Sequence, residues 1–114
     1  MIEKGLLKGS IKTIVLQLLH SQGKMYGYEI TQRVKELSND EILLTEGALY
    51  PLLHKMEADG LLTVDKQLIG KRVRKYYFLT PKGQKETTTK LEEFEAFIKT
   101  MQAVLYPKPN LKLS

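Results

Sequence analysis

Residues 61–79, which read LLTVDKQLIGKRVRKYYFL, decide the fold predicted for this chain of 114 residues. Residues 61–64 and 73–79 are rich in the β-branched and aromatic side chains that favour strands. Residues 68–71 lie between these two segments and are expected to connect them. The stretch is therefore predicted to form an antiparallel β-hairpin.

The same stretch carries the net charge of the protein. The chain has 18 basic and 13 acidic residues, a formal charge of +5. Five basic residues stand between positions 66 and 75, where there is no acid, and the remainder balances at 13 of each sign. A basic segment on a near-neutral body indicates contact with a polyanion, although a solvated loop is the alternative. The five residues are Lys66, Lys71, Arg72, Arg74 and Lys75.

Three helical patterns precede the hairpin. Apolar residues recur at helical spacing over residues 7–19, and Gly23 is a plausible stop. A second pattern covers residues 26–37 and ends in the turn-forming residues 38–40. The third begins after Thr45, which is predicted to be its N-cap.

The third helix is predicted to stop at residues 59–60. An apolar stripe on one face is expected to enter the core, and it consists of Leu49, Leu52, Leu53 and Met56. Pro51 removes a backbone donor within this helix, so an irregular first turn is expected there. Gly47 lies four residues earlier and makes a local adjustment easier.

Three helices followed by a basic hairpin describe a winged helix-turn-helix, a mainly α fold with a β-hairpin as its wing. The third helix then enters the major groove, while the wing meets phosphates or the minor groove. Tyr50 is a candidate for base contact, or it packs into the core; His54 is a second candidate, or a solvated surface residue. The predicted DNA-binding residues are Thr45, Gly47, Tyr50, Pro51, His54, Lys55, Lys66, Lys71, Arg72, Arg74 and Lys75.

A long last helix is predicted over residues 81–106, after a winged-helix domain at 1–80 and before a loose tail at 107–114. Its apolar residues recur in steps of three and four, which is a heptad stripe. The stripe predicts a dimer interface, and packing of the helix on its own domain is the alternative. The predicted interface residues are Leu91, Phe94, Ile98, Met101 and Leu105.

Four segments together resemble the PadR family of bacterial transcriptional regulators. They read YGYEI at 26–30, TEGALYPLL at 45–53, EADGLL at 57–62 and RKYYFLTPKG at 74–83. The resemblance is strong over residues 8–83, and the short chain is similar to the branch with a single C-terminal helix. It implies a homodimer that binds a palindromic operator and represses nearby genes.

An apolar effector pocket between the protomers is a further expectation, because the family uses that place. Phe94, Phe97 and Met101 would line it. Some short members hold flat drugs between tryptophans, and this chain has no tryptophan. The alternative is that these residues close a dry seam.

Other classes of protein have little support in the sequence. There is no cysteine, the two histidines are isolated, and no glycine-rich phosphate loop is present, so neither an enzyme nor a metal site is expected and no cofactor is predicted. The absence of a secretory signal pattern and of a long apolar stretch indicates a cytoplasmic protein. The main alternative function is a winged-helix module that docks an acidic protein partner.

Overall fold

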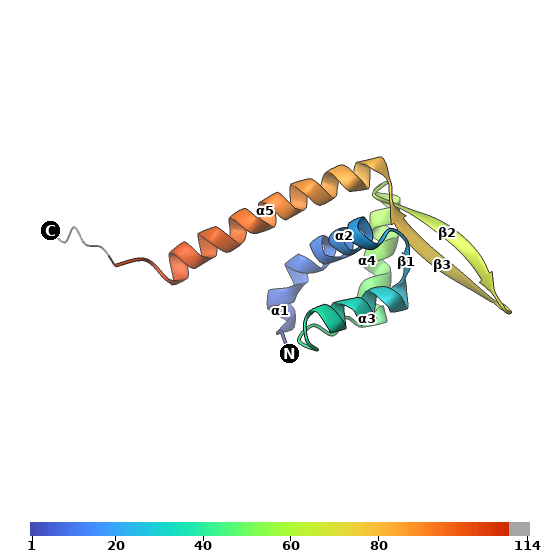
Figure 1. Cartoon of the computed structure of the whole chain (residues 1–114), viewed down its shortest axis with the longest axis horizontal. Helices are drawn as coiled ribbons and strands as arrows, with labels where there is room; N and C mark the ends of the chain where they lie inside the picture. Colours follow the sequence, from blue (N-terminus) through green and yellow to red (C-terminus); the bar gives the residue numbers. More distant parts are fainter. Residues whose placement is uncertain (110–114) are drawn as a thin grey trace.

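The computed structural model describes residues 1–109, and its chain order agrees with the winged helix predicted from the sequence (Figure 1). The elements are α1 (Lys4–Leu7), a 3₁₀ turn η1 (Lys8–Ser10), α2 (Ile11–Gln22), β1 (Met25–Tyr26), α3 (Gly27–Leu37), α4 (Glu46–Ala58), β2 (Leu62–Ile69), β3 (Arg72–Leu79) and α5 (Pro81–Leu105). The predicted tail at 107–114 lies partly outside the described residues, since 110–114 are not among them.

The helices end where the sequence places its turn residues. Gly23 follows α2 with φ of 88°, a value that glycine adopts without strain. Asn39 and Asp40 follow α3 with φ of 52° and 66°, in the left-handed region that these two residue types tolerate. The predicted first helix is divided, however, because η1 interrupts it before Ile11.

Helix α4 runs from Glu46 to Ala58 without a break, although Pro51 lies inside it. The irregular first turn expected around this proline is therefore not visible as an interruption. Pro51 is exposed, on the side of α4 that faces away from the core. The helix begins as predicted, since the Thr45 hydroxyl accepts a hydrogen bond from the Ala48 amide at 3.2 Å.

The core forms where α2, α3 and α4 meet the base of the sheet. Burial of apolar area at this junction is the main force holding the helices together. The apolar stripe of α4 enters it as predicted, except that Leu52 is only half-buried. The fully buried residues of the core include Val15, Leu16, Leu19, Ile30, Leu49, Leu53, Met56 and Tyr77.

The sheet has three strands in the order β1-β3-β2, one more than the predicted hairpin. Strand β1 is only two residues long and pairs Met25 with Tyr77 and Tyr26 with Tyr76. Residues 68 and 69 belong to β2, so the predicted four-residue connection shortens to the turn Gly70-Lys71. Gly70 has φ of 61°, which suits the first position of a type II′ turn.

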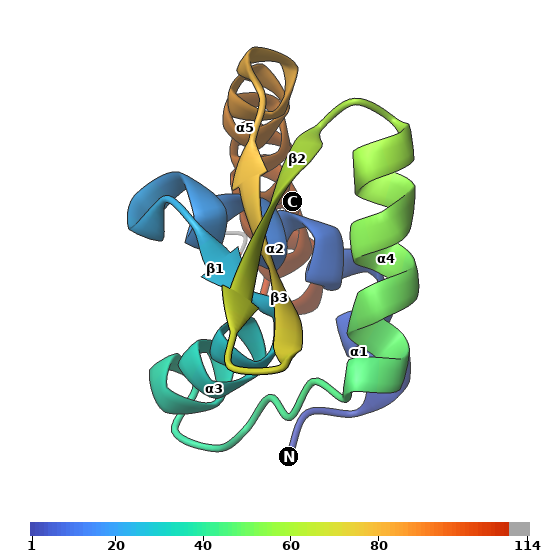
Figure 2. The same ribbon diagram turned by 90° about the vertical axis from the view of Figure 1, so that its right-hand side faces the viewer.

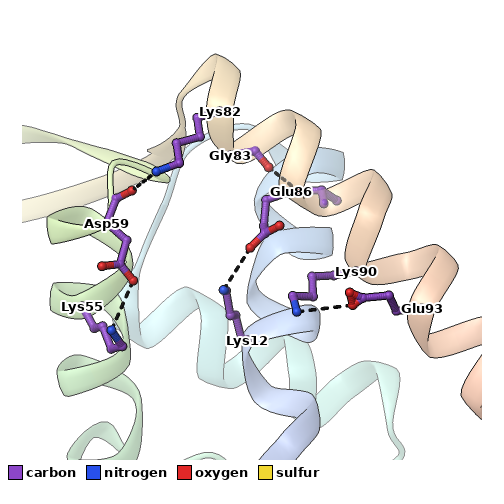
Figure 3. Close-up of polar contacts among 9 residues, drawn as sticks. Lys12, Lys55, Asp59, Lys82, Gly83, Glu86, Lys90 and Glu93 are labelled. Atoms are coloured by element: carbon purple, nitrogen blue, oxygen red, sulfur yellow. Dashed lines mark hydrogen bonds and ion pairs between the residues drawn. The ribbon is translucent and has the colours of Figure 1, made fainter.

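Helix α5 begins on the body of the domain and then leaves it (Figure 1). Its first half lies along α2, where Lys12 pairs with Glu86 at 3.1 Å (Figure 3). On the same side, His20 Nδ1 lies 2.7 Å from Gln84 Oε1. Its second half extends past α2. The radius of gyration is 17.4 Å, against about 13 Å for a compact domain of this length.

The start of α5 is fastened to the turn that ends α4, and we call this junction the clasp (residues 59–61 and 80–83). Lys82 Nζ donates to the Asp59 carbonyl at 2.8 Å, and the Thr80 hydroxyl donates to the Gly60 carbonyl at 2.6 Å (Figure 3 shows the lysine contact). Gly83 lies so close that a Cβ there would stand 2.1 Å from the Leu61 carbonyl oxygen. Helices α4 and α5 therefore meet at a rigid junction.

Candidate nucleic-acid interface

The exposed side of α4 has the composition predicted for a helix that enters a groove. Gly47, Pro51, His54 and Lys55 are all exposed there, while the opposite side is buried in the core. We call these four residues the reading face. Small residues allow close approach to DNA, and His54 and Lys55 supply polar groups.

Thr45 and Lys55 already have partners within the chain. The Thr45 hydroxyl caps α4, and Lys55 Nζ lies 3.3 Å from an Asp59 carboxylate oxygen. This ion pair is exposed, so it contributes little to stability and leaves Lys55 available to a stronger anion. Thr45 is exposed at the positive end of the α4 dipole, a position that favours a phosphate.

Tyr50 packs partly against the protein and stays partly exposed, so its contact with a base remains a prediction. Its ring rests on α3, where a Cβ on Gly27 would lie 2.6 Å from the Tyr50 hydroxyl oxygen. The residue is only half-buried, and it lines a surface groove. Burial, with a smaller effect of Glu46, raises the pKa of Tyr50, so its hydroxyl stays protonated and able to donate.

The wing, formed by β2, β3 and their turn, presents most of the basic cluster to solvent. Lys66, Lys71, Arg72 and Lys75 are exposed. Lys66 pairs directly across the hairpin with Lys75, an arrangement of like charges that destabilises an isolated sheet. A phosphate between them would relieve the repulsion.

Arg74 differs from the other basic residues of the wing, because it is half-buried and folded back on the protein. Its guanidinium carbon lies 4.1 Å from the centroid of the Tyr26 ring. Its Nη1 donates to the Tyr76 hydroxyl at 3.4 Å, a long contact that raises the pKa of Arg74 and keeps it charged.

A groove of about 570 Å³ separates the wing from α3 and α4, and we call it the wing groove. Figure 2 views the molecule from this side, with α4 and α3 flanking the hairpin. The sequence analysis predicted only its basic residues and Tyr50. The groove is lined by Tyr26, Tyr28, Glu46, Tyr50, Ile69, Arg72, Val73, Arg74 and Lys75.

Apolar side chains near the tip of the wing are exposed beside the predicted DNA-binding residues, and they were not among the residues predicted from the sequence. Leu68 and Val73 are a cross-strand pair, and Val73 is 61 % exposed. The sequence signal for these residues was the presence of apolar residues beside lysines at the predicted hairpin tip, since a loop that is only solvated does not need apolar residues. Such residues can contact sugars and the floor of a DNA groove.

The chain matches the Transcriptional regulator PadR-like family over residues 15–89, which is more than half of its length. The chain belongs to the PadR family. It is therefore a DNA-binding transcriptional regulator and not an enzyme, and the winged-helix fold predicted from the sequence is confirmed.

Known relatives of this PadR-family chain agree with the assignment. The transcriptional regulator Rv3488 of Mycobacterium tuberculosis is 37% identical over 75 residues, which cover 64% of this chain and 67% of the relative. A transcriptional regulator from Clostridium thermocellum superimposes with a TM-score of 0.82 at 29% identity, covering 95% of this chain and all of the other.

One structural relative was determined with its target. Bacillus subtilis PadR in complex with operator DNA superimposes with a TM-score of 0.65 at 25% identity. The match covers 91% of this PadR-family chain and 51% of the Bacillus protein.

The stripe predicted as a dimer interface in this PadR-family chain is largely uncovered. Leu91, Ile98, Met101 and Leu105 are exposed, whereas Phe94 is half-buried and lies 6.0 Å from the Phe97 ring, centroid to centroid. The stripe continues into a second groove of about 530 Å³, which we call the apolar groove. It is lined by residues of the N-terminal segment, α2, α3 and α5 that include Ile2, Leu6, Ile14, Leu37, Leu91 and Phe94.

Two classes of site are absent from the described part of this PadR-family chain. Within residues 1–109, no group of histidine, aspartate and glutamate side chains is arranged to hold a metal ion. None of the helices in that range is both long enough and apolar enough to cross a bilayer.

Proposed function

We propose that this PadR-family regulator is a repressor that binds a palindromic operator as a homodimer. The observation that carries the proposal is that α4 and the basic wing border one groove, which Tyr50 of α4 lines together with Arg72 and Lys75 of the wing. Figure 2 shows α4 and the hairpin from this side. Repression follows from an operator that overlaps the site of transcription initiation. A regulator of this kind acts in the cytoplasm, where we place it.

The reading face and the wing divide the work of DNA binding. Helix α4 enters the major groove, where Tyr50 and His54 reach base edges and Lys55 reaches a phosphate. Base-edge contacts carry sequence information, whereas phosphate contacts fix position. Lys66, Lys71, Arg72 and Lys75 supply phosphate contacts from the wing, and these are sensitive to salt.

The exposed half of α5 supports the homodimer. Phe97 is 57 % exposed and Val104 67 %, and both lie on a helix that leaves its own domain. Large contiguous apolar surfaces are rare on monomeric proteins. A second copy related by a two-fold axis would cover this surface with the same surface of its own and would place part of its α5 in the apolar groove.

An apolar effector would act at the same interface. Phe94, Phe97 and Met101 border the seam, and methionine adapts readily to ligands of different shape. Two α4 helices must lie about 34 Å apart to enter successive major grooves. An effector that binds more tightly to another spacing would release the operator.

The experiment that tests the proposal is selection of bound sequences from a random duplex library, followed by titration of the best sequence. We expect an inverted repeat, two chains per duplex and a preference over scrambled DNA of at least about a thousandfold at physiological salt. A single unrepeated site bound by one chain would contradict the dimer. Uniform affinity for all sequences would contradict operator recognition.

Release is tested separately with the preferred duplex. Apolar aromatic compounds, some of them cationic, would be screened by thermal shift and then added to the protein–DNA complex. A compound that stabilises the free protein and lowers operator affinity supports the effector pocket. A compound that stabilises the protein and leaves operator affinity unchanged would refute the mechanism, because binding linkage is reciprocal.

A further inference from the structure

The wing changes character at Arg74. At its base, β3 is held between β2 and β1, but β1 reaches only as far as the pair Tyr26–Tyr76. Beyond that pair, residues 72–75 are bonded to β2 alone, so the outer wing is a two-stranded ribbon. Such ribbons twist more than larger sheets and have little support of their own. A contact at this boundary controls the direction of everything beyond it.

Arg74 makes that contact. Its guanidinium carbon lies 4.1 Å from the Tyr26 ring centroid, while Nη1 reaches the Tyr76 hydroxyl at 3.4 Å. The two tyrosine rings meet edge to face, with centroids 5.4 Å apart and planes at 71°. The flat guanidinium therefore rests on one ring and points at the hydroxyl of the other, and we call these three residues the wing clamp.

The body of the protein holds Tyr26 in place. Its amide donates to Glu29 Oε1 at 3.1 Å at the start of α3. The Tyr50 ring of α4 packs over the next residue, Gly27. A continuous series of contacts thus joins the outer wing to the reading helix through Arg74, Tyr26, Gly27 and Tyr50, and the first, second and last of these line the wing groove.

We infer that Arg74 is a positioning residue, which with Tyr26 and Tyr76 fixes the distance between the wing and α4. The inference rests on the proposed operator binding, because the wing groove must match the DNA that separates the two contacts. The sequence analysis placed Arg74 among the residues that bind phosphate. Its geometry assigns that work to its exposed neighbours Arg72 and Lys75.

Two substitutions, one at each end of the clamp, separate positioning from phosphate binding. Arg74→Lys keeps the charge and loses the flat group that stacks, and Tyr26→Leu loses the ring without changing charge. We expect each to weaken operator binding about two- to fivefold, the range for a cation–π contact of this exposure, with the salt dependence unchanged. Tyr26→Phe keeps the ring and should bind like the wild type.

The matched control is Arg72→Ala, which should lower the slope of log affinity against log salt by about one. Combining Arg74→Lys with Tyr26→Leu should weaken binding no more than either change alone, because both remove the same contact. Wild-type affinity of Arg74→Lys and of Tyr26→Leu, with a slope reduced by about one in Arg74→Ala, would make Arg74 a phosphate contact and overturn the inference.

A measurement without DNA keeps the clamp separable from operator binding. Arg74 side-chain protons above the Tyr26 ring should resonate upfield of their usual NMR positions, and Tyr26→Leu should abolish that shift while Tyr26→Phe retains it. If the wild type showed this upfield shift but bound all DNA sequences equally, the result would contradict the proposed function and would support the clamp. Arg74 side-chain protons at their usual NMR positions in the wild type would contradict the clamp itself.

Discussion

At the scale of single residues, Gly27 and Tyr50 show how a glycine can serve recognition. The absence of a side chain on Gly27 lets the Tyr50 ring rest on the first turn of α3. The contact holds Tyr50 at the edge of the wing groove, where we expect it to contact a base. Neither residue alone reveals this role in the sequence, because they are 23 positions apart.

Gly27→Ala should therefore disturb recognition more than stability. The new methyl group would push the Tyr50 ring outward, and a half-buried ring can move without opening the core. We expect operator preference over scrambled DNA to fall about fivefold, the value of one lost hydrogen bond, with the melting temperature nearly unchanged. Gly9→Ala is the matched control, since nothing lies within 4 Å of its Cβ position. Equal effects of the two changes would contradict the role of Tyr50.

Tyr77 is expected to lower the stability of the folded protein at alkaline pH. Burial raises the pKa of the Tyr77 hydroxyl above its ordinary value of about 10, with smaller effects from Glu57 and Tyr50. Above that ordinary value the unfolded chain loses the proton while the folded chain retains it, so stability falls as pH rises. Urea midpoints at pH 9 and 10.5 should differ more for the wild type than for Tyr77→Phe. Parallel behaviour of the two proteins would contradict this assignment.

At the scale of elements, stability and DNA binding place opposite requirements on the charges of the wing. Lys66 and Lys75 face each other across the hairpin and repel. The base of the hairpin is tied to β1 through β3. Just before β1, Lys24 pairs with Asp65 of β2 at 2.8 Å and lowers the pKa of that carboxyl. Because the facing lysines lower the stability of the free hairpin, we attribute the basic cluster to the proposed binding of DNA.

Lys66→Glu tests this opposition. An opposite charge facing Lys75 should stabilise the free protein by about 0.5 kcal/mol and should weaken binding to operator and random DNA alike. Thermal melts and fluorescence anisotropy measure the two effects. Lys85→Glu makes the same charge change on α5, and a comparable loss of DNA affinity there would show that net charge, not the wing, is responsible.

The clasp is the second element-scale feature with a sharp consequence. A methyl group on Gly83 would meet the Leu61 carbonyl, which is backbone and cannot rotate away. We expect Gly83→Ala to lower the free energy of unfolding by about 2 kcal/mol, within the range for overpacked sites. Chemical denaturation measures it. A loss below about 0.5 kcal/mol, the usual range of a neutral surface change, would contradict the tight junction.

Elements with a strong local pattern could be predicted, and those that depend on distant partners could not. The buried and exposed faces of α4 follow from helical period, and Thr80 with Pro81 marks the start of α5. Strand β1 has only two residues and no pattern of its own, so it exists only because β3 offers an edge. The position of Arg74 depends on that same pairing, since its partner Tyr26 lies 48 residues earlier.

At the scale of the whole molecule, α5 gives the chain an elongated shape. The longest dimension is 73 Å, and the second half of α5 extends past the body of the domain (Figure 1). Its apolar residues Phe97, Val104 and Leu105 are exposed. The heptad spacing of the stripe was readable in the sequence. The apolar groove was not, because it gathers residues from the N-terminus, α2, α3 and α5.

Charged residues in the middle of the stripe should prevent assembly. The double change Ile98→Lys and Met101→Lys places two positive charges where a second copy would pack, and burial of unpaired charge is costly. Sedimentation should show a folded monomer or an insoluble chain, with operator binding lost. Thr100→Lys, on the other side of α5, is the control and should leave the dimer intact. A soluble double variant that still sediments as the wild-type dimer would contradict the interface.

In the proposed homodimer, the clasp would make α5 a lever that turns about the seam between the two copies. Its 25 residues span about 37 Å at about 1.5 Å per residue. The predicted seam is centred on Ile98, about 25 Å along the helix from Pro81. A tilt of about 7° at the seam would therefore carry the clasped end, and α4 with it, through about 3 Å, which is close to the rise of one base pair. A change of angle too small to disturb the packing of either copy is therefore enough to move a reading helix out of register with its half-site.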